Sequence, residues 1–584
     1  MAFVIPPLDK RQCGQRFECC RGWYRLSFCE GTLYDEPVFS GFDPDTAGYS
    51  LSRYSTSREL SHYTLFRGSS FPEEAGVSPS AIDIERAAFW NDSLLVSFDS
   101  NRGEWRILCN RAASIPVFWK TLNGCTVVSN SMSALGEHTE KPDRIAFAES
   151  LIWDLPLRAR TLQEGISQLQ AGYKLVITAD GAKAQKSHLL EFGSGRTTMH
   201  RVDLVRKAAD LNSRAVELAI RPSERLIVPI SGGLDSRCIL GAIPPNALHR
   251  CSAVSFGQHY SLEMPIGRVV ARACGVPWTR YILNANHYTR DFTEAIYEGF
   301  GLLPLQHLHL YSALLQCAFE PSQVLTGFMG DPVAGADAHH TSDILNKDQA
   351  VKAMLLKAGL TIERVEELFG SETVAGIVND IEWLFEDVTS HNSSSSFWEY
   401  YFIVERQSKL ITHIFNTLNF AGHILGFPFM DGEWARFYLS LPPEFRVKRY
   451  LFRNVLKLQR PDLARIISTD NFASITASPF LQECSRHTSV WLNRICILSQ
   501  RITGYRYSLP NPFATELQGV ILRGTMKERL AIAVDGLFAY GLLSDSLSKM
   551  LRGKYCLRYP GAGFRTITLA EYIRSTDHAT RSVC

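Results

Sequence analysis

The sequence lacks the patterns that mark several common protein classes. Its 14 cysteines include no CxxC pair, which makes zinc-ribbon and thioredoxin-type sites weak hypotheses. It also has no Gly-Lys-Ser or Gly-Lys-Thr ending of the kind that completes a Walker loop. Neither sign of charge is in excess, because 61 basic residues nearly balance 59 acidic ones to give a net charge of +2. That balance argues against a broad electrostatic footprint for nucleic acid.

A secretory leader and a membrane span are not indicated either. Residues 1–10 lack a basic stretch followed by a long apolar core. The most apolar window, Gly301–Phe319, is interrupted by two glutamines and by His307 and His309, so a buried helix with core histidines is expected there. The scattered cysteines favour buried, reduced thiols. A cytoplasmic protein with no membrane partner is therefore predicted.

What the sequence does contain is enough chain for two or three domains, at 584 residues and 65.6 kDa. Roughly the first 190 residues are rich in short β-branched and aromatic runs. These runs are residues 22–28, 94–98, 105–108, 115–120, 126–129 and 175–178. Asn123-Gly124 is a strong signal for a tight turn between two of them. An antiparallel β-sandwich is expected here.

From about residue 201 the pattern changes to strands that alternate with helices. Val202–Ile220 has helical periodicity, and the apolar run Leu226–Ile230 predicts a buried strand before a further helix. Ala253–Phe256 and Pro265–Cys274 repeat the strand-helix order. Such alternation is typical of a parallel α/β sheet.

One short motif, Ser231-Gly-Gly-Leu-Asp-Ser236, follows the first of these strands directly. Its two glycines let the backbone pass close to a ligand and expose successive N–H groups. The next helix turns its positive N-terminal end toward the same place. Asp235 can hold Mg²⁺, which neutralises phosphate charge. The alternative is a tight strand-to-helix turn that Ser236 caps.

The motif resembles the pyrophosphate loop of the ATP-pyrophosphatase superfamily, and further segments narrow the resemblance to the asparagine synthetase family. Thr326–Asp331 lies where that family carries an SGEGxD loop, and Pro428–Asp431 is similar to its PFLD. The remaining similar segments, in the family's order, are residues 110–118, 128–135, 441–443 and 450–453. The resemblance covers about residues 85–465.

The resemblance implies an ATP-dependent, AMP-forming amide ligase. A substrate carboxylate would attack the α-phosphate of ATP, and ammonia or an amine would then displace AMP from the acyl-adenylate. It implies Asp235 and Asp331 as catalytic residues and Mg²⁺ ligands. The implied nucleotide-binding residues are Ser231, Gly232, Gly233, Leu234, Asp235, Ser236, Val254, Ser255, Phe256 and Gly330. Glu263 resembles an acidic position of the family, or is only a solvated carboxylate at a helix start.

The resemblance also implies a division into domains. Residues 1–195 would form a β-rich, glutaminase-like domain, and residues 196–480 the ATP-binding α/β domain. Residues 481–584 would be a helical C-terminal extension. The partners implied are a small-molecule or peptide carboxylate and an amine or ammonia, while a homodimer or a partner protein is left open.

This sequence departs from the family's pattern at several positions. Ala2 stands where the family's glutaminase has its nucleophilic cysteine, so glutamine hydrolysis is expected to be absent. Phe328 replaces the glutamate of the SGEGxD loop, and Phe328 and Phe429 would suit a bulky, less polar acceptor. The family's glutamate and arginine before PFLD are Ile424 and Gly426 here.

The lysine that the family uses to stabilise the charge of the adenylate is also missing, since no lysine lies between Lys457 and Lys527. Arg465 is the nearest basic residue in the expected stretch. Four other cations nearby are alternatives for this role, although each is expected to be a solvated charge on a polar helix face: Lys448, Arg449, Arg453 and Lys457.

The leading hypothesis is therefore an amide ligase of this family without its own glutaminase. One alternative is a cyclase of the kind that closes β-lactam rings or lasso peptides. Another is a nucleotide-binding pseudoenzyme or scaffold, which the missing lysine and glutamate favour and the retained Asp235 and Asp331 oppose. A tRNA-modifying enzyme is disfavoured, because neither basic patches nor thiolation cysteines are present.

Overall fold

The computed structural model describes backbone in most of the chain from residue 102 onward and in five earlier strands. The described residues are 25–29, 32–33, 49–57, 60–67, 93–99, 102, 104–109, 115–122, 124–135, 141–187, 197–221, 225–283, 287–288, 292–336, 344–390, 397–469, 472–503, 509, 524–553, 555–556 and 559–581. Ala2 lies outside them, so the prediction about this position stays a prediction.

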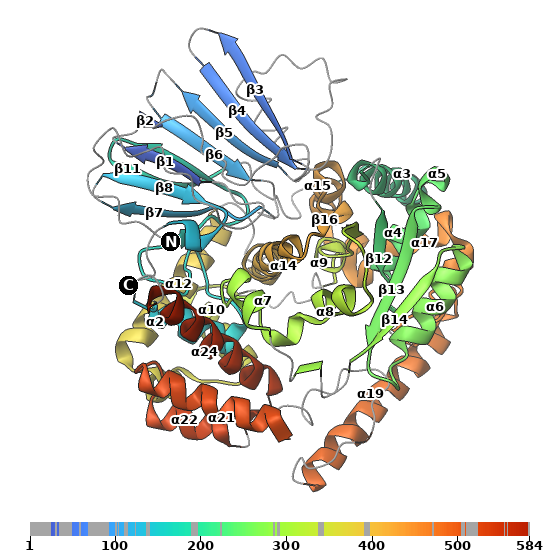
Figure 1. The fold of residues 1–584 in the computed structure, drawn as a ribbon. Helices are drawn as coiled ribbons and strands as arrows, with labels where there is room; N and C mark the ends of the chain where they lie inside the picture. Colours follow the sequence, from blue (N-terminus) through green and yellow to red (C-terminus); the bar gives the residue numbers. More distant parts are fainter. Residues whose placement is uncertain are drawn as a thin grey trace.

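Two antiparallel sheets form the layers at the upper left of Figure 1. The first has the order β2-β1-β8-β7-β9 and the second β11-β10-β6-β5-β4-β3. Their strands are β1 (Arg25–Cys29), β2 (Thr32–Leu33), β3 (Tyr49–Ser57), β4 (Leu60–Arg67), β5 (Ser93–Asp99), β6 (Glu104–Cys109), β7 (Phe118–Leu122), β8 (Cys125–Ser129), β9 (Ser167–Gln168), β10 (Tyr173–Thr178) and β11 (Gly181–Lys186). Gly124 joins β7 to β8 with φ = 77°, as the expected tight turn requires.

A parallel sheet of five strands, in the order β14-β13-β12-β15-β16, forms the other half of the molecule. Its strands are β12 (Leu226–Pro229), β13 (Cys251–Gly257), β14 (Trp278–Ile282), β15 (Gln323–Leu325) and β16 (Ile424–Gly426). The central strands are buried on both faces, which is why they read as continuous apolar runs. The prediction of antiparallel sheets followed by a helix-covered parallel sheet is confirmed. That the first part is a glutaminase-like remnant stays a prediction.

Helices surround the parallel sheet and fill the space between it and the antiparallel layers (Figure 1). Those used below are α2 (Arg144–Trp153), α3 (Arg201–Ala219), α4 (Asp235–Ala242), α6 (Glu263–Ala273), α7 (Thr293–Glu298), η4 (Leu305–His307), α8 (His309–Gln316), α9 (Gly330–Val333), α12 (Ser371–Thr389), α13 (Phe397–Tyr400), η6 (Tyr401–Gln407), α14 (Ser408–Phe420), α15 (Gly432–Ser440), α17 (Tyr450–Gln459), α18 (Pro461–Ala464), α19 (Pro479–Ile502), α21 (Gly524–Ala539), α22 (Asp545–Arg552) and α24 (Pro560–Arg581).

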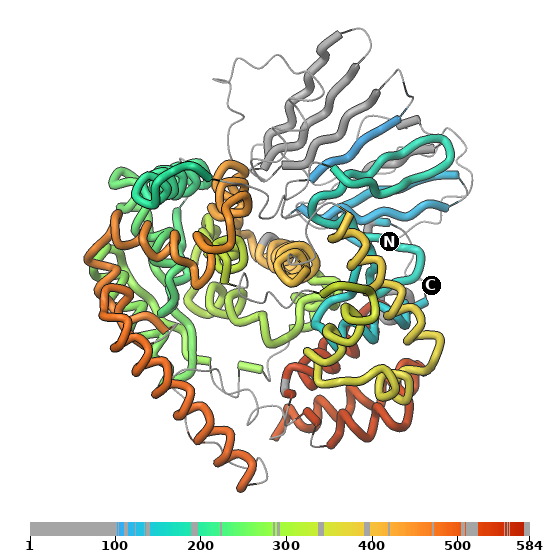
Figure 2. The backbone as a smooth tube through the Cα atoms, turned by 180° about the vertical axis from the view of Figure 1, so that it is seen from behind, coloured from blue at the N-terminus to red at the C-terminus, as the bar shows by residue number. Residues whose placement is uncertain are grey.

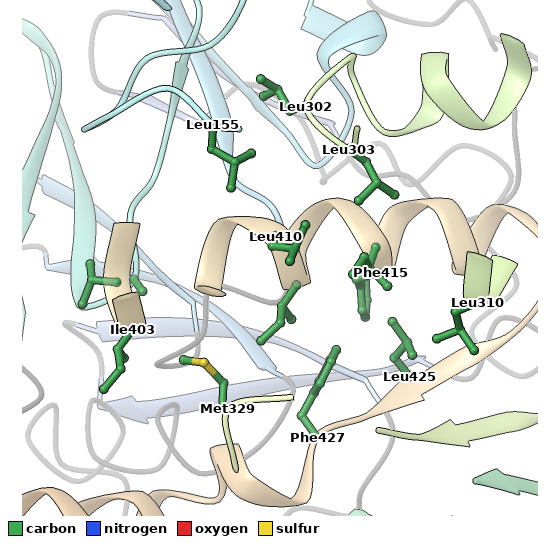
Figure 3. Close-up of a cluster of buried hydrophobic side chains, with 14 of the residues drawn as sticks. Leu155, Leu302, Leu303, Leu310, Met329, Ile403, Leu410, Phe415, Leu425 and Phe427 are labelled. Carbon is green, nitrogen blue, oxygen red and sulfur yellow. The ribbon is translucent and has the colours of Figure 1, made fainter. Parts of the chain in front are cut away.

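The centre of the molecule is a helix whose middle turns are a π-helix, since η6 connects α13 to α14 without a break. Leu410 and Phe415 of α14 point into the same apolar cluster as Met329 and Phe427 (Figure 3). All four side chains are buried. The cluster therefore fixes the loops on either side of residues 329 and 427 against the central helix.

The C-terminal helices are bonded to both earlier parts of the chain. Tyr572 of α24 accepts a hydrogen bond from Gln163 at 3.1 Å, and Thr568 accepts one from the Leu305 N–H at 2.9 Å. Arg565 pairs with Asp154 just after α2. These contacts bring α24 against the antiparallel half and against η4, while the boundaries at residues 195 and 480 stay predictions.

The cysteines depart in one place from the expected reduced state. Eight of the described cysteines are free, and most of these are buried. Cys125 is instead disulfide-bonded, and Cys29 lies directly opposite it in the β1–β8 register. The prediction of reduced thiols is therefore wrong at Cys125. None of the described helices has the length and apolar content needed to cross a bilayer.

Candidate functional site

The residues 231–236 connect β12 to α4 at the carboxyl end of the central parallel strand. This edge is where open α/β sheets bind their ligands. β13 continues for three residues beyond Val254, the last position paired with Pro229 of β12. The backbone of Ser255 and Phe256 thus lies beside the loop, as the sequence predicted.

Backbone N–H groups of the loop find oxygen partners within the protein. The Ser231 N–H donates to the Ser236 hydroxyl at 3.2 Å, and the Gly233 N–H donates to the Ser231 hydroxyl at 3.1 Å. The Gly232 N–H donates to the carboxylate of Glu263 at the start of α6. The Gly232 N–H thus binds one anionic oxygen within the folded chain, whereas the other two N–H groups donate to hydroxyls of the loop itself. Glu263 is therefore not merely a solvated carboxylate.

The fully buried Arg237 holds the loop in place through hydrogen bonds to backbone carbonyls. Its guanidinium donates to the Gly232 carbonyl at 2.9 Å and to the Ile466 carbonyl at 2.8 Å. Thr469 lies over the loop, with its N–H donating to the Gly232 carbonyl at 2.9 Å. A Cβ at position 232 would come within 2.2 Å of the Thr469 side chain, so only glycine fits. The segment after α18 thus closes one wall of the loop.

The loop at residues 326–331 packs directly on Asp235. A Cβ at Gly330 would come within 2.9 Å of Asp235 Cγ, and one at Gly327 within 2.8 Å of Asp235 Cβ. Met329 adopts φ = 70°, a left-handed conformation, and its buried side chain anchors the turn in the apolar cluster of Figure 3. The fold therefore brings Asp331 next to Asp235, as the motif order predicted.

One cation joins the two carboxylates. Arg449 forms an ion pair with Asp331, and its Nη1 lies 3.8 Å from Asp235 Oδ1. Its side chain is 13% exposed, against 51% for Asp331 and 21% for Asp235. Lys448 and Arg449 both have positive φ, 55° and 56°, which turns the chain sharply before α17. The expectation that Arg449 is a solvated charge is wrong.

Other basic residues near the site point elsewhere. Arg465, the nearest candidate by sequence, ends α18 and is exposed. Arg453 donates to Gln482, and Lys457 is exposed. Among these basic residues, Arg449 is the one that the structure pairs with Asp235 and Asp331. The sequence marks it only as one alternative of four, because its orientation depends on two consecutive left-handed residues that are not glycine.

Several residues near the site are structural. Ser255 is buried, and its hydroxyl donates to the Ile230 carbonyl at 2.7 Å and accepts from Trp278 at 2.9 Å. Phe429 is fully buried and packs on Trp434 with ring centroids 4.8 Å apart, so it is a core residue and does not line an acceptor site. Asp431 caps α15 through the Trp434 N–H at 2.9 Å. Phe328 is only half-buried and remains available to a ligand.

Asp235 and Asp331 provide two carboxylates, which is the type of ligand that binds a divalent metal ion such as Mg²⁺. Mg²⁺ is often held by one or two protein carboxylates while substrate phosphates and water complete its shell. Within the described ranges no group of three or more histidine, cysteine or acidic side chains could hold a metal ion. Asp235 and Asp331 therefore supply two protein carboxylates, and a metal ion bound there would need further ligands from another molecule or water.

His307 and His309 lie near α8 but do not form a metal site. Burial lowers the pKa of His307 to about 4, and it lowers the pKa of His309 as well. His309 Nδ1 lies 3.0 Å from the Gln306 carbonyl. Both are neutral and half-buried, so they lie at the edge of the core rather than within it.

Comparison with known proteins adds little. No family model matches the sequence, and no curated protein matches it. Among solved structures, the chain is similar to a glutamine phosphoribosylpyrophosphate amidotransferase from B. subtilis complexed with ADP and GMP, at 11% identity over 68% of this chain and 94% of that one. The TM-score is 0.18, too low for the match to carry an argument.

Proposed function

We propose that this protein is an ATP-dependent, AMP-forming amide ligase that adenylates a carboxylate and transfers the acyl group to ammonia or an amine. The observation that carries the proposal is the meeting of the SGGLDS loop with Asp331 at the end of the central parallel strand. An N–H group that donates to a carboxylate, two further carboxylates and one arginine converge there. These are the groups that charge neutralisation of a leaving pyrophosphate requires.

Each group has a distinct task in this proposal. The loop N–H groups and the start of α4 would hold the β- and γ-phosphates, displacing the Glu263 carboxylate from the Gly232 N–H. Asp235 and Asp331 would hold Mg²⁺, which supplies charge neutralisation on the phosphates when bound. Arg449 would leave its carboxylate partners when the metal replaces it and turn to the developing charge on the α-phosphate. The guanidinium keeps its charge throughout, because its pKa is far above neutral.

The acceptor end of the site supports a substrate other than free aspartate. Phe328 occupies the position of the family's glutamate, and it can neither accept a proton nor bond an amine. Ile424 and Gly426 lie in the buried strand β16 and offer no charge. A bulky, less polar carboxylate or amine is therefore the proposed substrate class, and intramolecular ring closure belongs to the same chemistry.

The test is carboxylate-dependent release of pyrophosphate and AMP from ATP, measured with a panel of carboxylates and amines in the presence of Mg²⁺. We expect at least one member to give AMP rather than ADP. Asp235→Asn should lower the rate by about 100-fold or more. Asp210→Asn, at an exposed aspartate of α3, is the matched control and should leave the rate unchanged.

Other outcomes distinguish the alternatives. Clear ATP binding without pyrophosphate release by any panel member would support the nucleotide-binding scaffold instead. Full activity of Asp235→Asn would show that the site has been placed wrongly. Release of ammonia from glutamine by the intact chain would contradict the inference drawn from Ala2.

A further inference from the structure

A long helix near the C-terminus, α19, leaves most of its surface exposed. It runs away from the parallel sheet, and its C-terminal end extends beyond the other described elements in Figures 1 and 2. Its first turns are attached to the body through Gln482, which accepts from Arg453 at 2.5 Å, and through Ser485, which donates to the Phe472 carbonyl at 2.8 Å. Farther along, Cys496 and Gln500 are buried and the Ser499 hydroxyl accepts from the Leu509 N–H at 3.1 Å, while the opposite face of the helix is exposed.

The exposed face of α19 has a seven-residue repeat. Positions spaced alternately by three and four residues carry Leu481, Cys484, Thr488, Trp491, Ile495, Leu498 and Ile502. This is the a/d spacing of a coiled coil, with Leu481 at a and Cys484 at d. The large members are far from buried: Trp491 is 62% exposed, Leu498 55% and Ile502 76%. We call these seven residues the α19 seam.

The seam faces away from the rest of its own chain. The two buried residues of α19 are Cys496 and Gln500. In the same heptad they take positions b and f, which lie on the outer side of a coiled coil, opposite a and d. The helix thus uses one side for its own protein and presents the other, apolar side to solvent. An exposed apolar stripe of this length marks an interaction surface.

The charges that flank the seam indicate what it pairs with. On one side, the g positions carry His487, Arg494 and Arg501. On the other side, the e positions carry only uncharged residues, Ser485, Leu492 and Ser499. In a parallel pair of identical helices each g residue meets an e residue of the partner, so no like charges meet. In an antiparallel pair g would meet g, and the arginines would repel.

We propose that the α19 seam pairs with the α19 seam of a second copy of this chain, as a parallel coiled coil. Strict 3.5-residue spacing is characteristic of helix pairing, whereas a helix lying on a membrane needs only an apolar stripe with the 3.6-residue period. The small side chains at positions 484 and 488 also suit close approach of two helices. This inference is independent of the proposed ligase function.

Sedimentation velocity of the full chain over a range of concentrations tests the proposal. We expect a species of twice the 65.6 kDa chain mass that dissociates on dilution. Leu498→Glu places a charge in the seam and should weaken the dimer by about tenfold or more. Ile497→Glu is the matched control, because Ile497 is also exposed, at 36%, but occupies position c. It should leave dimerisation unchanged.

The parallel, in-register arrangement has a separate signature. It places Cys484 of one copy beside Cys484 of the other at a shared d layer, so a short bismaleimide should link the two thiols. Cys484→Ser should abolish that link while the dimer persists in sedimentation. Leu498→Glu and Cys484→Ser both alter exposed residues of the seam. Circular dichroism and a Tm equal to those of the parent would show that these variants fold.

Three results would overturn the proposal. The first is a monomer at all concentrations, and the second is equal weakening by Leu498→Glu and Ile497→Glu. The third is a monomer that binds phosphatidylglycerol vesicles with a blue shift of Trp491 fluorescence, which would assign the seam to a membrane surface instead.

Discussion

Two clusters of carboxylates and cations lie in this molecule, and they differ in how they are enclosed. At the sheet edge, Arg449 bridges Asp235 and Asp331, all partly exposed. At the junction with the antiparallel sheets, Lys409 pairs with Glu405 at 2.8 Å, with side chains 4% and 0% exposed. The first cluster opens to solvent, and the second is sealed inside the protein.

In the closed cluster, the charged groups find their hydrogen-bond partners within the protein. Lys409 Nζ donates to the Pro156 carbonyl at 2.6 Å and to the Arg158 carbonyl at 2.7 Å, besides Glu405. Every partner belongs to the fold, so the cluster has a structural task. In the open cluster an arginine lies between two carboxylates, where the proposed function would place a metal ion and phosphates. The same residue types thus stabilise a junction in one place and form a candidate ligand site in the other.

The closed cluster should show the largest effect on stability. Lys409→Met leaves the Glu405 carboxylate buried without its cation, so the free energy of unfolding should fall by about 3–5 kcal/mol. In the double variant Glu405→Gln, Lys409→Met no charge is left unpaired, and more than half of the loss should return. Urea unfolding measures both. A single variant within about 1 kcal/mol of the parent would contradict a structural role for the pair.

Acid should destabilise the closed region through His413, one turn after Lys409. Burial, with the charge of Lys409 adding to it, lowers the pKa of His413 to about 3 from its ordinary 6.5. Neither ring nitrogen has a hydrogen-bond partner among the described residues. The unfolded chain therefore binds a proton that the folded chain excludes, and stability falls as the pH drops from about 6.5 toward about 3.

Within this window, protonation of this one group should lower the free energy of unfolding by about 1.4 kcal/mol for each pH unit. His413→Leu should remove that pH dependence. Urea unfolding of both proteins at steps of about half a pH unit between about pH 6.5 and about pH 5 measures it. If the free energy of unfolding depended on pH equally in the variant and the parent, His413 would be protonated in the folded state, contrary to this prediction.

The open cluster should respond to metal rather than to denaturant. Asp331→Asn removes one proposed ligand, so the Mg²⁺ concentration for half-maximal pyrophosphate release should rise by about tenfold, with stability within about 0.5 kcal/mol. Asp380→Asn is the contrasting variant, because the buried Asp380 pairs with Arg158 and Arg160 in the closed region. It should lose stability and keep the parent's Mg²⁺ dependence. The assignment of the two clusters would be contradicted if Asp331→Asn lowered stability while Asp380→Asn changed the Mg²⁺ dependence.

Much of the architecture was predictable because local patterns have local causes. The apolar run Leu226–Ile230 became β12 since a strand buried on both faces needs no polar alternation. The turn after it was predictable because glycine is needed where the backbone lies against another segment of the chain. Gly232, which packs against Thr469, is an example. Arg237 was not recognised, since a buried arginine next to a loop looks like any helical charge in the sequence.

The sequence by itself determined the order of strands and helices, the glycine turn after β12 and the absence of a charge excess. Only the tertiary structure decided that Arg449 lies between Asp235 and Asp331, that Phe429 belongs to the core, and that Glu263 reaches the Gly232 N–H. The reason is physical. Periodicity and turn chemistry act over a few residues, whereas the pairing of distant charges depends on how whole elements pack and on left-handed residues such as Lys448 that redirect the chain.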